Sequence, residues 1–110
     1  MDDEEMTRSE FFRALSPELD SDDRHALQSL GHDLDPVVLV GQRGISDGLI
    51  ENFDNQLDAH ELVKVKVHGG DMIREVARRL HEETGAQLAQ IIGNVLLFYR
   101  EHPEEPELLR

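Results

Sequence analysis

A short segment flanked by glycines is the part of this sequence whose residue types point most directly to binding chemistry. Gly41-Gln42-Arg43-Gly44 follows a short apolar run and precedes a predicted helix. Glycine at both ends permits a sharp turn and lets a ligand approach the backbone without a Cβ in the way. The first amides of the following helix and the Arg43 guanidinium together suit a phosphate oxygen. Because two glycines at this spacing are common, an ordinary strand-to-helix turn is the alternative interpretation.

Basic side chains elsewhere in the chain could extend such a phosphate-binding surface. Lys64 and Lys66 are the only lysines, and they lie two residues apart in one predicted strand. Arg74 and Arg78 are four residues apart on a predicted helix, and Arg24 lies in an earlier one. Taken singly, each group is also compatible with a solvated face or with lysines that protect a strand edge. Together with the loop they form a predicted basic track.

The sequence offers little for catalysis or metal binding. His60-Glu61-Leu62-Val63-Lys64 begins like a zinc-protease helix motif, but it ends in lysine and lies in a region that alternates like a strand. Cysteine is absent, and no nucleophile elbow, phosphate-loop lysine motif or dinucleotide fingerprint occurs. We therefore expect a protein that is not an enzyme, with no metal, no cofactor and no small-molecule substrate.

The charge is concentrated at the two ends of the chain. The formal net charge is −13 over 110 residues, which argues at first against a nucleic-acid partner. Residues 1–23 hold nine acids and two arginines, and residues 101–110 hold four acids and one arginine. The central residues 24–100 carry eight of the eleven basic side chains. A local basic surface in the centre is therefore compatible with the acidic total.

The periodicity of apolar residues predicts one α/β domain. Val63, Val65 and Val67 should face the helices, whereas Leu62, Lys64 and Lys66 should face outward. The order α-β-α-β-α-β-β predicts a two-layer domain with helices on one face of a mixed sheet and the other face open. The predicted elements are a helix capped by Ser21 that ends at Gly31, a strand at 37–40, a helix capped by Ser46, a strand at 62–67, a helix ending at Thr84, and strands at 86–92 and 95–100.

The predicted domain organisation has three parts. Residues 1–20 form an acidic extension, which is predicted to be either a frayed helix or disordered. Residues 21–100 form the folded domain, and residues 101–110 form a disordered acidic tail. No apolar run approaches the roughly 20 residues needed to span a bilayer. We expect a cytoplasmic, monomeric protein.

Four blocks of this core, in order, resemble the YhbY-like, or CRM, RNA-binding domain family. The resemblance spans residues 21–100 and implies a four-stranded mixed sheet ordered 1-2-4-3, similar to the C-terminal domain of bacterial translation initiation factor 3. It also implies that the Gly41–Gly44 loop contacts RNA in the way of the KH-domain loop. The blocks are Pro36-Val37-Val38-Leu39-Val40-Gly41-Gln42-Arg43-Gly44-Ile45-Ser46, His60-Glu61-Leu62-Val63-Lys64-Val65-Lys66-Val67, Glu83-Thr84-Gly85-Ala86 and Ile91-Ile92-Gly93-Asn94-Val95-Leu96-Leu97-Phe98-Tyr99-Arg100.

The resemblance also implies a role, because stand-alone bacterial members associate with precursor large ribosomal subunits. Precursor ribosomal RNA is then the expected partner, with ribosomal proteins as further candidates for the acidic ends. This chain departs from the family in its acidity, in Gly93-Asn94 where a basic residue is common, and in Asp35 where one is frequent. An acidic protein-interaction adaptor on the same fold, with little affinity for RNA, is therefore the alternative.

Overall fold

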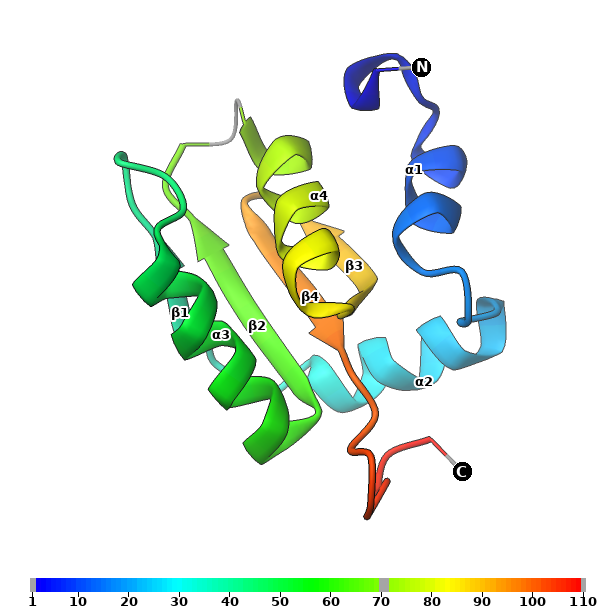
Figure 1. The fold of residues 1–110 in the computed structure, drawn as a ribbon. Coiled ribbons are helices and arrows are strands. Elements are labelled where there is room, and N and C mark those ends of the chain that lie inside the picture. The colour runs from blue at the N-terminus through cyan, green and yellow to red at the C-terminus, as the bar shows by residue number, and fades with distance from the viewer. Residues whose placement is uncertain (1, 70–71, 110) are drawn as a thin grey trace.

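A computed structural model describes residues 2–69 and 72–109 (Figure 1). Its order of helices and strands matches the predicted one, preceded by a short N-terminal helix and a 3-10 turn. The elements are η1 (Asp3–Glu5), α1 (Arg8–Leu15), α2 (Ser21–Gly31), β1 (Val38–Val40), α3 (Asp47–His60), β2 (Leu62–Val67), α4 (Ile73–Thr84), β3 (Gln87–Ile92) and β4 (Val95–Tyr99).

The four strands form one mixed sheet in the order β1-β2-β4-β3. β1 pairs with β2 in parallel, and β4 lies antiparallel to both β2 and β3. A register shift between Leu88 and Gln90 interrupts the ladder of β3 with β4. The predicted mixed sheet and its strand order are confirmed.

Helix ends follow from short-range hydrogen bonds that the sequence encodes. The Ser46 side chain accepts the Leu49 N–H at 3.2 Å, which confirms Ser46 as the cap of α3. The prediction that Ser21 caps α2 is wrong by one residue. The Asp20 carboxylate accepts the Asp23 N–H at 2.7 Å, so Asp20 is the cap and Ser21 is the first helical residue.

The larger hydrophobic core lies between the sheet and the helices α1, α3 and α4 (Figure 1). Val63, Val65 and Val67 are buried there, as predicted from the strand alternation. Phe53 of α3 meets Phe98 of β4 edge to face, with ring centroids 5.3 Å apart. This core fixes α3, and with it the loop that precedes α3.

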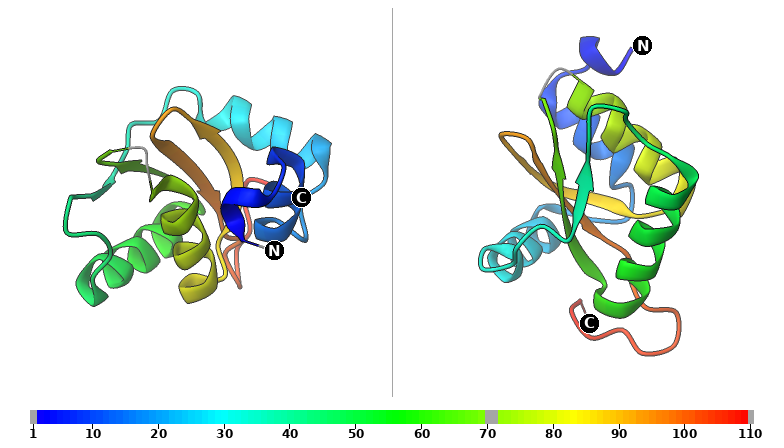
Figure 2. Two further views of the ribbon diagram at one scale, coloured as in Figure 1. Left: turned by 90° about the horizontal axis from the view of Figure 1, so that it is seen from above. Right: turned by 90° about the vertical axis from the view of Figure 1, so that its left-hand side faces the viewer.

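The expectation that all helices share one face of the sheet, with the other face open, is wrong for α2. Figure 2 shows α2 on the opposite side of the sheet from α3 and α4. Leu27 of α2 packs there with Leu62, Leu97 and Tyr99 in a second, smaller core. Leu62 was expected to face outward, but it is only 5% exposed because α2 covers it. The uncovered part of this face lies toward β1, where Leu39 is 68% exposed.

Both ends of the chain contact the domain. Residues 8–15, for which a frayed helix or disorder was expected, form a helix whose Phe11 and Leu15 are buried in the larger core. Residues 101–109 have no regular secondary structure, but the buried Glu61 carboxylate accepts the N–H groups of His102 and Glu107 at 2.9 and 2.8 Å. In this structure the acidic ends lie against the core.

Candidate functional site

The Gly41–Gly44 loop is exposed and joins β1 to the segment that precedes α3. The Gly44 N–H donates to the Gly41 carbonyl at 3.0 Å, which closes a tight turn. Gly44 has a φ of +76°, a conformation that side chains with a Cβ rarely adopt. A Cβ added at either glycine would meet nothing within 4 Å. The space over the backbone is therefore open to a ligand.

One side of this loop borders a groove of about 510 Å³ formed with α4 and the end of β2. The basic side chains in its lining are Arg43 and Arg79, and both are exposed. His68 lies beside them, with its Nε2 atom 3.2 Å from the Gln42 amide nitrogen. Among the described residues that line this groove, Glu75 is the one acidic side chain. The groove therefore presents basic groups next to the two glycines.

The other side of the loop borders a second hollow, on the uncovered part of the sheet. Lys66 lines it together with Leu39 and with Asn94 of the β3–β4 turn. None of its described lining residues carries a carboxylate. Lys64, two residues earlier, is half-buried and its Nζ lies 3.5 Å from the His32 carbonyl, away from the loop in a different hollow. Lys66 is therefore brought to the loop, and Lys64 is not.

Arg79 is a member of this arrangement that the sequence interpretation missed. It lines the groove with Met72, Glu75 and Val76 of the same helical segment. Residues three, four and seven positions apart lie on one face of a helix, so the sequence spacing could have placed Arg79 beside the other three. The prediction chose the neighbouring stripe with Arg74 and Arg78 instead.

Arg74 and Arg78 hold the N-terminal segment. Nη1 of Arg74 donates to the carbonyls of Asp3 and Met6 at 2.6 and 2.8 Å. Arg78 forms an ion pair with Asp3 at 2.6 Å, and this hydrogen bond raises the pKa of Arg78. Both guanidinium groups also lie near the Phe11 ring, 5.0 and 6.0 Å from its centroid. These two arginines are thus engaged on the other side of α4 from the loop.

Arg24 also has partners far from the loop. Its Nη1 donates to the Leu19 carbonyl at 2.8 Å and to the Ser16 hydroxyl at 3.4 Å. It lines a cleft between α1, α2 and β3. The predicted basic residues are therefore divided among four places. Arg43 and Lys66 lie at the loop, where Arg79 joins them.

Other chemistry is not suggested by the arrangement of the described residues. Across residues 2–69 and 72–109, no three His, Cys, Asp or Glu side chains are grouped so as to hold a metal ion. In the same residues, no helix combines the length and apolarity needed to cross a membrane.

Comparison with known proteins defines the class of this domain. Residues 19–100 match the model of the CRS1/YhbY (CRM) domain. The chain therefore belongs to the CRS1/YhbY (CRM) domain family.

Individual relatives agree with this assignment. The chain is 36% identical to an "RNA-binding protein" of Haemophilus influenzae over 88 residues, which cover 78% of this chain and 89% of the relative. It is 34% identical to "Probable RNA-binding protein YqeI" of Bacillus subtilis, with coverage of 74% and 88%. The solution structure of the hypothetical protein SAV1595 from Staphylococcus aureus has a TM-score of 0.69 and 36% identity, and covers 83% of this chain and 99% of that one. The likeness to translation initiation factor 3 stays a prediction.

Proposed function

We propose that this protein binds RNA through the Gly41–Gly44 loop and acts on precursor ribosomal RNA during large-subunit assembly, as a monomer in the cytoplasm. RNA as the partner is supported by the relatives, which are named for RNA binding. The observation that carries the site is the open space over both glycines, flanked by the exposed side chains of Arg43, Lys66 and Arg79.

Each part of the loop has a role in this proposal. Gly41 and Gly44 let the sugar–phosphate backbone of RNA come close to the protein backbone. Arg43 donates charge-assisted hydrogen bonds to a phosphate oxygen, and Gln42, oriented by His68, contacts phosphate or ribose. These contacts follow the shape and charge of the RNA backbone and carry little information about its sequence.

The number of cations at the loop sets the expected strength of binding. Arg43, Lys66 and Arg79 flank it. Asp47 in the first turn of α3 and Glu75 oppose them, because both bring negative charge near the same space. We therefore expect a modest affinity that declines with salt, with two or three phosphates neutralised. That corresponds to a slope of log K against log salt of roughly −2.

Titration of fluorescent rRNA fragments tests the binding step. Arg43→Glu should weaken binding and flatten the salt dependence. The double variant Ser29→Glu/Gln56→Glu changes the net charge by the same amount at positions that do not line the hollows beside the loop, and it should change the salt slope less. An acidic adaptor on the same fold predicts the opposite pattern: no binding even at low salt, and no effect of Arg43→Glu.

The assembly role needs a separate measurement. We expect the protein to co-sediment with precursor large-subunit particles in gradients of cell extract, and the Arg43→Glu variant to move to the top of the gradient. A wild-type protein that binds RNA in the titration but never migrates with these particles would reject the assembly role and leave RNA binding intact.

A further inference from the structure

We propose that a cleft lined by arginines, between α1, α2 and β3, is a second RNA-binding site that lies apart from the Gly41–Gly44 loop. This inference rests on the proposed function and extends it, because it assigns the N-terminal helix α1 a part in binding. α1 lies outside residues 19–100, which match the family model. The ligand would be an unpaired stretch of the same RNA.

The charge of this cleft is opposite to that of the whole chain. It has a volume of about 610 Å³, and its lining includes Arg8, Arg13 and Arg24. No acidic residue is among its described lining residues, although the chain has 24 acids and 11 basic residues. The rest of the lining combines polar side chains, among them Ser9, Gln28 and Gln90, with the apolar Phe12, Ile91 and Ile92. A surface of this composition suits a phosphate backbone with bases beside it.

Two of the cleft arginines, Arg8 and Arg24, are held in place by backbone carbonyl groups. Nη2 of Arg8 donates to the Ile91 carbonyl at 2.8 Å, and the guanidinium carbon lies 5.3 Å from the Phe12 ring centroid. Arg24 is held by the Leu19 carbonyl at 2.8 Å. Within the described residues, no carboxylate oxygen lies within 4.0 Å of these guanidinium groups, in contrast to Arg78 and Arg100. Because a guanidinium has five N–H donors, donors of each side chain remain for a phosphate.

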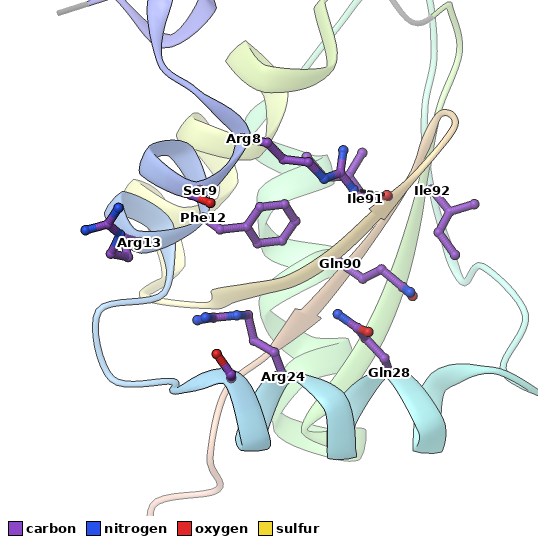
Figure 3. A pocket seen from close by; sticks show the side chains of 10 residues that line it. Arg8, Ser9, Phe12, Arg13, Arg24, Gln28, Gln90, Ile91 and Ile92 are labelled. Atoms are coloured by element: carbon purple, nitrogen blue, oxygen red, sulfur yellow. Dashed lines mark hydrogen bonds between the residues drawn. The ribbon is translucent and has the colours of Figure 1, made fainter.

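The arrangement of the side chains places cationic and stacking groups in one space. Figure 3 shows Arg8 reaching from α1 toward Ile91, with Phe12 between α1 and β3, while Arg24 and Gln28 rise from α2 on the facing side. Phe12 is half-buried, so part of its ring can accept a base or the plane of a guanidinium. The Gln28 amide donates to the Ala89 carbonyl at 3.0 Å, which directs its carbonyl oxygen for use as an acceptor.

The cleft and the loop are connected through the β3–β4 hairpin. Ile92 lines the cleft, and Asn94, two residues later, lines the hollow beside Gly41 and Arg43. The longest extent of the molecule is 34 Å. At the rise of about 3.4 Å per nucleotide of a stacked strand, roughly ten nucleotides span this length, and a more extended strand needs fewer. One unpaired strand of that size can therefore contact both sites.

Two substitutions add negative charge to the cleft with little cost to folding. Ser9→Glu is in the first turn of α1, where an acid favours the helix dipole and can pair with Arg13 four residues on. Gln90→Glu is nearly isosteric. The matched control is Ser29→Glu with Gln56→Glu, which adds the same charge through the same residue types at positions that line neither site. Circular dichroism and thermal unfolding confirm that each variant is folded.

Fluorescence anisotropy with an unstructured 12-nucleotide RNA tests the proposal. We expect Ser9→Glu/Gln90→Glu to weaken binding about tenfold, since each added charge opposes a phosphate contact, and the control pair to weaken it less than about threefold. If Arg43→Glu weakens binding and the cleft variant binds like its control, the second site is rejected and the loop stands. If the wild-type protein binds no RNA, both proposals fail.

Two competitors separate RNA from other anions. Adenosine monophosphate, which has the phosphate and base but no strand, should not displace the oligonucleotide. Displacement at similar concentration would assign the cleft to free nucleotides. Poly-glutamate should bind more weakly than RNA, and equal binding with the same dependence on the cleft would assign it to an acidic protein partner. Either of these results overturns the proposal.

Discussion

The two faces of α4 use neighbouring arginines in different ways. Arg79 is exposed at the groove beside the Gly41–Gly44 loop, whereas Arg78 is paired with Asp3 and covered by the N-terminal segment. They are adjacent in sequence and have the same chemistry, but Arg78 is partly buried in an ion pair, whereas Arg79 is exposed. The difference teaches that the partners of each basic residue, more than the net charge, decide where an acidic protein can meet RNA.

The largest expected effect comes from reversing charge at the loop. Arg43→Glu with Arg79→Glu should weaken RNA binding by about 2 to 3 kcal/mol, because two charge-assisted contacts become repulsive. Titration at fixed salt measures this loss. Asp3→Asn is the comparison on the other face, and it should not weaken binding, since it removes only a partner of Arg78. A gain of affinity in Asp3→Asn, which makes the chain less acidic, would show that general charge contributes to binding beyond the loop, and unchanged binding by the double variant would contradict the role of the loop.

Replacing the loop glycines distinguishes the effect of backbone strain on stability from the effect of an added Cβ on the close approach of RNA. Gly44→Ala should lower the free energy of unfolding by about 1 kcal/mol, because its φ of +76° disfavours a Cβ. Gly41→Ala should change stability by less than about 0.5 kcal/mol, as its Cβ meets nothing within 4 Å and its φ is not in the left-handed region. Both should weaken RNA binding. Urea unfolding and titration supply the two readouts, and unchanged binding by Gly41→Ala would argue against close backbone approach.

Neighbouring arginines allow a crossed test of the comparison. Arg78→Met should cost about 1 kcal/mol of stability through loss of the partly buried ion pair with Asp3, and should spare RNA binding. Arg79→Met should leave stability within about 0.5 kcal/mol and weaken RNA binding about threefold. Unfolding curves and titrations of both variants give four values. Equal changes in stability and in RNA affinity for the two variants would contradict a functional difference between the two faces of α4.

The last prediction concerns Tyr99 in the second core and limits the pH range in which the stability of the variants can be compared. Burial, together with the charge of Glu61, raises the pKa of Tyr99 to about 12. Its hydroxyl is buried without a hydrogen-bond partner among the described residues. The unfolded state releases this proton near pH 10, whereas the folded state keeps it, so stability should fall from about pH 10 to 12. Tyr99→Phe should remove that part of the slope, and identical slopes would contradict the assignment.

Local features of the fold could be predicted from the sequence because their causes are local. The strand that contains Val63, Val65 and Val67, the Ser46 cap and the loop glycines each depend on neighbours within a few residues. The strand order required the family resemblance, since periodicity does not say which strands pair.

Features with distant causes were missed. Arg78 finds its partner Asp3 75 residues away, so its spacing from Arg74 suggested an exposed stripe that the structure does not contain. The burial of Leu62 depends on α2 crossing to the other side of the sheet, which strand alternation cannot show. The same holds for α1, whose buried Phe11 and Leu15 were visible as apolar residues but without a known place to pack.

An NMR titration of the ¹⁵N-labelled protein with an unpaired RNA tests the central claim most directly, because it reports every backbone amide in one experiment. We predict that the amide signals of residues 41–46 shift at the lowest RNA concentrations, and that those of Arg74 and Arg78 stay in place. RNA-dependent shifts that spare residues 41–46, or that begin at Arg74 and Arg78, would contradict the account.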